Sequence, residues 1–226
     1  MPEPAAESAV PTGGLLAGLC DELRGLHPRG RILVGIDGED GAGKTVFADG
    51  LATVLADEGM TVFRASIDGF HRPKAERYAR GHTSPEGFYR DSYDLDAFCR
   101  DLIERYRAGG SFRTAVHDIV TDGPVERVGG PAPSDAVLVV DGIFLHRPEL
   151  RELWHWSVWL EAPMNVRYAR MAVRDGSDPD PFAESNRRYR VGQELYRREA
   201  EPRSAACVIV DNTDPAHPRR SSVDIC

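Results

Sequence analysis

The sequence predicts an α/β protein in which a five-stranded parallel sheet is flanked by helices. Three observations support this fold class. Five short apolar runs recur along the chain, separated by segments with helical periodicity or by loops. The first run leads directly into a glycine-rich loop and a helix, and two later runs end in an Asp-Gly pair. Alternation of strands and helices of this kind is typical of a parallel, doubly wound sheet.

The N-terminal part begins with a helix and then alternates strand and helix. Leucines at helical spacing predict a helix over residues 15–26, which a Gly and a Pro end. Residues 31–37 form a β-branched apolar run, which indicates a buried strand. Apolar positions recur at helical spacing over residues 45–56, and residues 61–67 form a second strand-like run.

The middle of the chain is less regular. Residues 71–93 lose periodicity and are rich in Arg, Tyr, Gly and Pro, which in a compact domain usually marks a functional segment. Apolar side chains on one face predict a helix over residues 95–106. We expect a strand or hairpin arm over residues 112–120 and a loop rich in Pro and Gly over residues 121–134.

The C-terminal part returns to regular alternation. Residues 136–140, AVLVV, indicate a third core strand, and residues 156–160, WSVWL, a fourth. A helix with Pro at its start is predicted over residues 163–174, and a strongly charged helix over residues 183–199. Residues 206–210, ACVIV, complete the five predicted strands.

The break after the first strand has the pattern of a phosphate-binding loop. The eight residues that match G-x-x-x-x-G-K-[ST] are Gly38, Glu39, Asp40, Gly41, Ala42, Gly43, Lys44 and Thr45. Glycines let successive backbone N–H groups point at an anion, and the start of the next helix, which includes Val46, adds partial positive charge. Lys44 is placed to reach the β- and γ-phosphates, and the Thr45 hydroxyl to ligate Mg²⁺. The segment therefore predicts binding of a nucleoside triphosphate.

Two carboxylates follow the ends of other strands, where open α/β sheets place their ligands. Asp68 follows the second strand, and we expect it to accept a proton from an acceptor hydroxyl or to hold a Mg²⁺-bound water. Asp141 ends the third strand, where the second acidic residue of phosphate-loop enzymes acts on Mg²⁺. An Asx turn into the following glycine is the alternative for each.

Arginines gather in a segment that we expect to be a lid over about residues 168–192. Arg167, Arg170 and Arg174 share one face of the predicted helix. A loop rich in Gly, Pro and Asp follows, and further arginines begin the next helix. Arms of this kind around a hinge would close over ATP, with Arg170 and Arg174 stabilising charge on the transferred phosphoryl group. A solvated helix face is the alternative.

Residues 71–110 are predicted to be an acceptor-binding insertion, because basic and aromatic side chains are interleaved there. A charged exterior over a small aromatic core is the alternative. The predicted acceptor contacts in and around this insertion are Asp68, Phe70, His71, Tyr89, Arg90, His117 and Asp122.

Length and composition limit the class of protein. The 226 residues suit one domain over residues 15–215, with a disordered tail over residues 1–14 and a C-terminal tail over residues 216–226. A formal net charge of −8 argues against bulk nucleic-acid binding, and no apolar run approaches the ~20 residues of a membrane span. Cysteines without C-x-x-C pairs favour reduced thiols and a cytoplasmic location. The sequence leaves a homo-oligomer open.

Several motifs together resemble the uridine kinase group, to which phosphoribulokinase and the bacterial-type pantothenate kinase are related. They are VGIDGEDGAGKT, SIDGFH, VLVVDGIF, RYARMAVRD and ACVIVDNTD, in that order, over about residues 30–214. The resemblance implies an ATP- and Mg²⁺-dependent kinase that phosphorylates a hydroxyl of a small molecule. It also implies that Asp68 is the base, that Arg170 and Arg174 are lid arginines, and that Asp211 and Asn212 lie where the chain passes the adenine.

These motifs predict the type of reaction better than they predict the identity of the acceptor molecule. Uridine kinases typically read the pyrimidine with a Tyr-Asp-Phe segment followed three residues later by His, whereas this chain has His117-Asp118-Ile119 and then Asp122. Asp141 stands where uridine kinases usually carry Glu, and the Asp-Gly-Phe at residues 68–70 is closer to the pantothenate kinase motif.

Three functional hypotheses follow. The first is a nucleoside kinase of the uridine or cytidine type, and the second is a kinase of pantothenate, a sugar or another small alcohol. The third is a nucleotide-dependent ATPase or switch, although the sequence has no Asn-Lys-x-Asp motif for guanine. Asp68 and the lid arginines favour a kinase over a switch.

Overall fold

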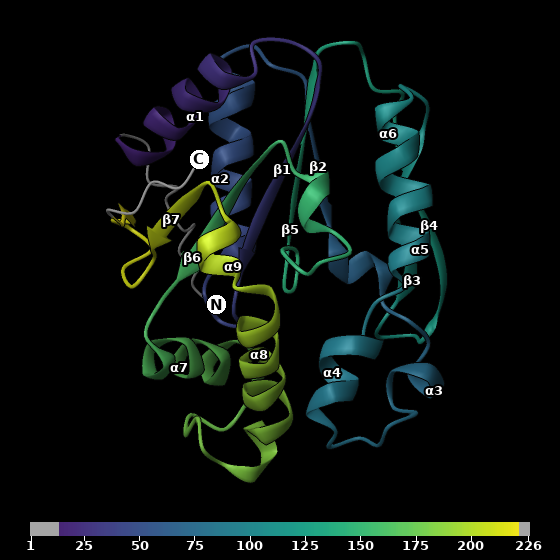
Figure 1. The fold of residues 1–226 in the computed structure, drawn as a ribbon, viewed down its shortest axis with the longest axis vertical. Helices are drawn as coiled ribbons and strands as arrows, with labels where there is room; N and C mark the ends of the chain where they lie inside the picture. Colours follow the sequence, from purple (N-terminus) through teal and green to yellow (C-terminus); the bar gives the residue numbers. More distant parts are fainter. Residues whose placement is uncertain (1–13, 222–226) are drawn as a thin grey trace, which may run out of the picture.

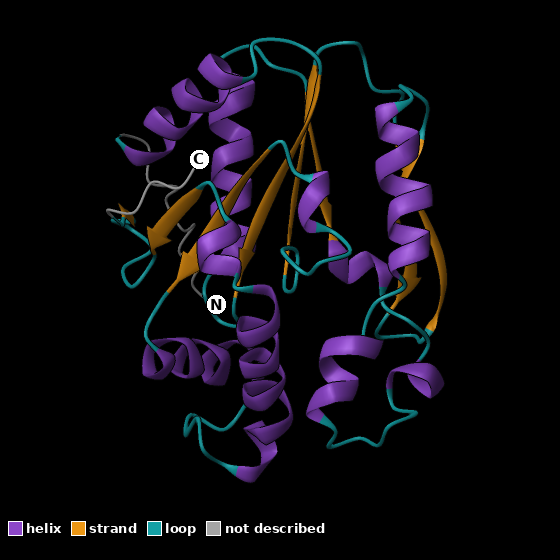
Figure 2. Ribbon diagram, in the orientation of Figure 1, coloured by secondary structure: helices purple, strands orange, loops and turns teal. Residues whose placement is uncertain are grey.

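A computed structural model describes residues 14–221, and the predicted tail over residues 1–14 lies outside the described residues except for Gly14. The central sheet has the order β2-β5-β1-β6-β7-β8 (Figure 2). Its first five strands pair in parallel, which confirms the predicted sheet. The strands are β1 (Arg31–Gly38), β2 (Val62–Ser66), β3 (Phe112–Asp118), β4 (Gly123–Gly129), β5 (Ala136–Gly142), β6 (Trp156–Glu161), β7 (Val208–Asp211) and β8 (Arg219–Arg220).

Helices and helical turns fill most of the intervals between strands (Figure 1). The α-helices are α1 (Leu15–Leu26), α2 (Lys44–Asp57), α3 (Lys74–Arg77), α4 (Pro85–Asp91), α5 (Leu95–Ala97), α6 (Arg105–Arg107), α7 (Met164–Asp175), α8 (Arg187–Ala200) and α9 (Pro202–Ala205). The 3₁₀ and π turns are η1 (Ile67–Phe70), η2 (Phe98–Glu104), η3 (Arg151–Leu153) and η4 (Glu184–Asn186).

The side chains of the central strands divide between two hydrophobic cores because successive residues of a strand point to opposite faces. In β1, Ile32, Val34 and Ile36 join the core beneath α1 and α2. Leu33 faces the other core, which also contains aromatic residues from the predicted insertion and from α8. Both faces of the sheet are therefore covered, as a mainly parallel sheet requires.

The predicted aperiodic segment contains two short helices, α3 and α4, and η2 is a π-helical stretch within the predicted helix over residues 95–106. The prediction of a loop over residues 121–134 was partly wrong, because this segment contains β4, which pairs with β3 as an antiparallel hairpin. Most residues of β4 are exposed or half-buried, so this strand lacks the apolar alternation that marks a strand in a sequence.

The C-terminal segment, expected to be a tail over residues 216–226, contributes an additional strand. Its residues Arg219 and Arg220 form β8, which pairs antiparallel with β7 at the edge of the sheet. A two-residue strand is too short to leave a periodic pattern in the sequence.

The segment predicted to be a lid packs against the predicted insertion through a close contact between α8 and α4 (Figure 1). Gly192 makes this contact possible, since a Cβ there would lie 2.7 Å from Cδ1 of Phe88 and 2.9 Å from the carbonyl oxygen of Pro85. On the same interface, Arg188 is buried and donates hydrogen bonds to the carbonyl oxygens of Gly81 and His82. The second arm of the lid is thus bound to the insertion.

A buried polar network lies beneath the phosphate loop and was not foreseen from the sequence. Asp37 at the end of β1 accepts hydrogen bonds from the backbone and Nδ1 of His146 and from the hydroxyl of Tyr196. Nε2 of His146 lies 2.9 Å from Oγ of Ser157. The Ser-His-Asp order resembles a hydrolase triad, but Asp37, His146 and Ser157 are 0, 1 and 3% exposed. The network therefore joins β1 to β6 and α8 rather than reaching a substrate.

Burial, together with Asp37, raises the pKa of Tyr196 well above its usual value, so this phenol stays a donor. A second buried phenol, Tyr168 in α7, has no hydrogen-bond partner for its hydroxyl among the described residues. Within residues 14–221, no helix combines the length and apolar character that crossing a bilayer requires.

These two phenols give a matched test of the network. Tyr196→Phe removes a donor from a buried carboxylate, so we expect the free energy of unfolding to fall by about 2 kcal/mol. Tyr168→Phe removes a hydroxyl without a protein partner and should leave the free energy of unfolding unchanged or slightly raised. Urea unfolding followed by circular dichroism measures both. An equal loss in the two variants would contradict the role of the network.

Candidate active site

The phosphate loop joins β1 to α2 and turns through two glycines with left-handed backbone angles. Gly41 has φ 76° and Gly43 has φ 91°, which strongly favours glycine. A Cβ at Gly41 would lie 2.5 Å from the carbonyl oxygen of Arg167, and one at Gly43 would lie 2.6 Å from Nδ2 of Asn212. The loop thus needs glycine both for its conformation and for the close approach of its neighbours.

The outward carbonyl groups of the loop, from Glu39 to Ala42, all have side-chain donors. These bonds run from Lys44 Nζ to Glu39 O (3.0 Å), from Arg167 Nη1 to Asp40 O (3.2 Å), from Arg170 Nη1 to Gly41 O (3.3 Å) and from Asn212 Nδ2 to Ala42 O (2.7 Å). Arg170 also donates to the carbonyl oxygens of Asn212 and Thr213. Arg170 and Asn212 therefore support the loop from its outer side.

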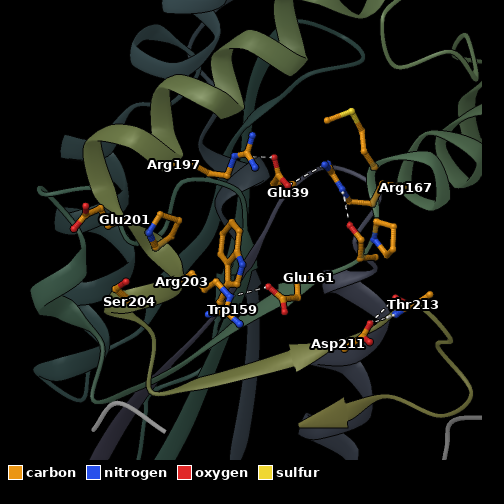
Figure 3. Close-up of a pocket in the computed structure, with 14 residues that line it drawn as sticks. Glu39, Trp159, Glu161, Arg167, Arg197, Glu201, Arg203, Ser204, Asp211 and Thr213 are labelled. Atoms are coloured by element: carbon orange, nitrogen blue, oxygen red, sulfur yellow. Dashed lines mark hydrogen bonds and ion pairs between the residues drawn. The ribbon is translucent and has the colours of Figure 1, made fainter. Parts of the chain in front are cut away.

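Glu39 turns away from the inner side of the loop. Its carboxylate pairs with Arg167 at 2.9 Å and with Arg197 at 3.5 Å, in a separate cavity of about 640 Å³ (Figure 3). Asp211 lines the same cavity and accepts hydrogen bonds from the backbone and hydroxyl of Thr213. Two residues predicted to bind ATP, Glu39 and Asp211, thus face a different cavity from the one at the inner side of the loop.

A cavity of about 530 Å³ opens at the inner side of the loop, and we call it the nucleotide-side cavity. Predicted nucleotide and metal residues that line it are Asp40, Gly41, Gly43, Lys44, Thr45, Val46, Asp68, Asp141, Arg170 and Arg174. Loop, helix N-terminus, Lys and Arg meet in one concave site, which is the arrangement that binds polyphosphate.

Asp141 is buried at the end of β5, beside the start of α2. The Thr45 hydroxyl donates to its Oδ2 at 2.7 Å, and Nη2 of Arg64 donates to its Oδ1 at 2.9 Å. Arg64, in β2, was not singled out in the sequence because an Arg inside an apolar run gives no functional signal by itself. The guanidinium of Arg64 forms an ion pair with the buried carboxylate of Asp141, which would otherwise lack a partner of opposite charge among the described residues.

Asp68 lies in η1, directly after β2, where Ser66 caps the turn. The Tyr93 hydroxyl donates to Oδ1 of Asp68 at 2.8 Å, and Nδ1 of His71 lies 2.8 Å from the carbonyl oxygen of the same residue. Burial, together with Asp68, raises the pKa of Tyr93 well above its usual value. Tyr93 is therefore a permanent donor that holds one oxygen of the carboxylate.

A further cavity, of about 270 Å³, is lined by Asp68 and by residues of the predicted insertion and the predicted lid, and we call it the acceptor-side cavity. Six residues line both this cavity and the nucleotide-side cavity: Asp40, Asp68, Tyr93, Ile143, Met171 and Arg174. The two cavities thus meet at Asp68 and Arg174. Arg174 is exposed and pairs with Asp175 at 2.7 Å.

Five of the seven residues predicted as acceptor contacts line neither cavity, and three of them, Phe70, Tyr89 and Arg90, belong to the aromatic core or its charged exterior. Phe70 is fully buried and packs edge-on against Phe98. Tyr89 is buried in the aromatic core against Phe144. Arg90 pairs with Glu86 and Glu199. The small aromatic core with a charged exterior, which was the alternative interpretation, describes these residues better.

His117 and Asp122 form a pair on the β3–β4 hairpin, with Nε2 of His117 3.1 Å from Oδ1 of Asp122. Asp122 also accepts a hydrogen bond from the backbone N–H of Lys74. His117 and Asp68 line a third cavity, of about 470 Å³. His117 therefore shares a cavity with Asp68 and is held by Asp122.

Fold and site together define a P-loop kinase, a phosphotransferase that binds a nucleoside triphosphate. The profile of the Phosphoribulokinase / Uridine kinase family matches residues 33–179, more than half of the chain. The chain therefore belongs to this family and is an ATP-dependent kinase. This confirms the resemblance seen in the motifs.

Individual relatives are distant but span most of the chain. A uridine kinase from Leuconostoc citreum is 24% identical over 152 residues, which is 67% of this chain and 70% of the relative. Among solved structures, a possible uridine kinase from Bacillus stearothermophilus has a TM-score of 0.70 at 24% identity, covering 86% of this chain and 96% of its own. A candidate fructose transport system kinase from Silicibacter sp. TM1040 has a TM-score of 0.68 at 25% identity, covering 83% and 96%.

The contact between Tyr93 and Asp68 predicts a positioning role that can be measured. Tyr93→Phe should lower kcat about tenfold, because one oxygen of the carboxylate loses its donor, while KM for ATP stays within about twofold of wild type. Tyr89→Phe is the matched control, since its ring lies in the core outside both cavities. Steady-state assays of ADP release measure both. A comparable loss of kcat in Tyr89→Phe would contradict this assignment.

Proposed function

We propose that this protein is a Mg²⁺- and ATP-dependent kinase that phosphorylates a hydroxyl of a nucleoside of the uridine or cytidine type. The observation that carries the proposal is the position of Asp68, which lines the cavity beside the phosphate loop and the acceptor-side cavity as well. A carboxylate at the junction of the two cavities is placed to act as a general base on an acceptor hydroxyl. Curated relatives named uridine kinase support the nucleoside.

In the proposed reaction, the acceptor oxygen attacks the γ-phosphorus of ATP, the bond from the γ-phosphorus to its bridging oxygen breaks, and ADP leaves. Asp68 accepts the proton of the hydroxyl. Lys44 and Arg174, which both line the nucleotide-side cavity, stabilise charge on the transferring phosphoryl group. Tyr93 keeps the Asp68 carboxylate in place during this step.

The residues beside the loop suit Mg²⁺, which prefers oxygen ligands such as hydroxyl and carboxylate. Thr45 and Asp141 would hold it, and Asp68 is a further candidate through a bound water. Residues 14–221 contain no group of three or more His, Cys, Asp and Glu that could hold a metal ion. Kinase Mg²⁺ sites usually combine one or two protein ligands with substrate phosphates, so we infer binding together with ATP. The bound ion neutralises charge on the β- and γ-phosphates.

We also propose a cytoplasmic location. The three described cysteines, Cys20, Cys99 and Cys207, are free thiols, which is the usual state in a reducing compartment. Burial raises the pKa of the Cys20 and Cys99 thiols, so neither is an activated nucleophile.

A sugar kinase is the second candidate function. Two observations favour it, namely the replacement of the expected pyrimidine-reading residues by His117 and Asp122, and the similarity to a candidate fructose transport system kinase. His117 can separate the two candidates because it lines the cavity of about 470 Å³ together with Asp68, so a base attached to the sugar could reach it, whereas a free sugar need not.

The role of Asp68 can be tested by Asp68→Asn. We expect ATP binding measured by calorimetry to stay within about twofold, while kcat falls by about 10²–10⁴-fold because the base is lost. Asp57→Asn, at the opposite end of α2 from the loop, is the control and should keep wild-type kcat. Near-normal turnover in Asp68→Asn would remove Asp68 as the base.

The acceptor can be tested by ADP release from MgATP with uridine, cytidine, fructose, ribose and pantothenate, each against a blank without acceptor. Stimulation by uridine or cytidine, with KM raised about tenfold in His117→Ala, is the expected result. Stimulation by fructose or ribose alone, unaffected by His117→Ala, would replace the nucleoside with a sugar. A blank as fast as every sample would indicate an ATPase.

A further inference from the structure

Asp40 is the residue through which the phosphate loop reaches the acceptor-side cavity. Among the eight loop residues, all of which the structure describes, only Asp40 lines that cavity. Its backbone N–H donates to Oε1 of Gln193 at 2.7 Å, and Nε2 of Gln193 lies 3.3 Å from its Oδ2. Gln193 is buried, so it holds the Asp40 side chain in one orientation. Oδ1 of Asp40 has no hydrogen-bond partner within residues 14–221.

Asp68, which lines the same cavity, is arranged in the same way. Its Oδ1 accepts the hydrogen bond from Tyr93, and its Oδ2 has no partner in the described part of the chain. The cavity thus presents two carboxylate oxygens whose lone pairs are available. Since a carboxylate only accepts hydrogen bonds, a ligand that satisfies both must bring two donor groups.

The charge of the acceptor-side cavity disfavours an anionic ligand. Its lining carries three carboxyl groups, of Asp40, Asp68 and Asp175, against one guanidinium, of Arg174, which is already paired with Asp175. Burial raises the pKa of Asp40, an effect that nearby Lys44 opposes, so most of the negative charge comes from Asp68 and Asp175. Like-charge juxtaposition at a binding site costs enough free energy to exclude a partner. A carboxylate or phosphate on the acceptor would meet this repulsion.

Tyr168 supplies an independent observation that favours an uncharged ligand over a cationic one. Its side chain is 1% exposed, lines the acceptor-side cavity, and has a hydroxyl without a partner among the described residues. A buried polar atom without a protein partner usually forms a hydrogen bond with a bound ligand or water. A ligand hydroxyl can donate to the carboxylates and also accept from Tyr168, whereas an ammonium group can only donate.

From these contacts we infer that the acceptor is an uncharged compound with at least two hydroxyl groups, one bound by Asp68 and another by Asp40, so that Asp40 determines specificity. The inference rests on the proposed kinase function and narrows its acceptor. It admits the sugar part of a nucleoside or a free sugar and excludes pantothenate and sugar phosphates. A cavity of about 270 Å³ lies at the small end of ligand pockets and suits a group of monosaccharide size.

The test measures ADP release by the full chain with acceptors that differ in one feature. Uridine is compared with 2′,3′-dideoxyuridine, ribose with ribose 5-phosphate, glucose with glucosamine, and pantothenate is added as an anion. In whichever of these pairs the enzyme phosphorylates, we expect kcat/KM for the neutral compound with several hydroxyl groups to be at least tenfold higher than for the other compound.

Two variants connect this selectivity to the residues. Asp40→Asn replaces an acceptor oxygen with a donor, and we expect it to raise KM for the accepted compound about tenfold while KM for ATP stays within about twofold. Tyr168→Phe should raise the same KM about threefold without loss of stability, which keeps the test informative if Asp40→Asn folds poorly. Asp57→Asn is again the control, because its side chain is exposed at the far end of α2.

The possible failures are distinguishable. Turnover of only ribose 5-phosphate or pantothenate leaves an ATP-dependent kinase in place but overturns the inference. Three other results would also overturn the inference. They are full activity with 2′,3′-dideoxyuridine, a preference for glucosamine over glucose, and an Asp40→Asn variant in which only KM for ATP changes. ADP release that no acceptor stimulates removes the proposed function itself, and the inference with it.

Discussion

The site depends on one constraint: a loop that turns its N–H groups toward phosphate must find partners elsewhere for its outward carbonyl groups. Arg167 and Arg170 from α7 and Asn212 from the end of β7 provide these donors. They can do so because the strand order places β6 beside β1 and β7 beside β6, on the same side of β1. Since α7 also begins the predicted lid, the same helix holds the carbonyl groups of the loop and carries the first residues of that segment.

This constraint also explains how the arginines are used. A chain rich in Arg suggests a strongly basic site, yet Arg167, Arg170 and Arg188 all donate to backbone carbonyl groups. A guanidinium group is suited to this task because it offers several donors in one plane and stays charged when buried. What remains in the acceptor-side cavity is one exposed guanidinium, of Arg174, among several carboxylates. The arginines therefore stabilise the frame of the site more than they attract the acceptor.

The main elements could be predicted because their side-chain periodicity reflects their own burial. Four of the five parallel strands are short apolar runs buried along most of their length, β2 being half-buried, and α2 and α7 carry apolar positions at helical spacing. The sequence did not indicate β4, α3 or α4. Strand β4 and helix α3 are short and largely exposed, and the buried residues of α4, Gly87, Phe88 and Tyr89, form one unbroken run rather than a helical pattern. Tyr89 and Arg90 were misplaced for a related reason, since interleaved charged and aromatic residues occur both in a binding surface and over a small core.

Three aspartates show most clearly what a sequence cannot predict. Asp37, Asp68 and Asp141 each stand at or just after the end of a strand, and each is followed by a glycine. The sequence by itself determined the phosphate loop, the parallel sheet, and the placement of these groups at one edge of it, because those features depend on local patterns and on strand direction. Only the tertiary structure decided their separate environments. Asp37 is enclosed by His146 and Tyr196, Asp141 is paired with Thr45 and Arg64, and Asp68 keeps one free oxygen in a cavity. Burial and hydrogen bonding come from residues far away in the chain, so no local pattern could have told these three aspartates apart.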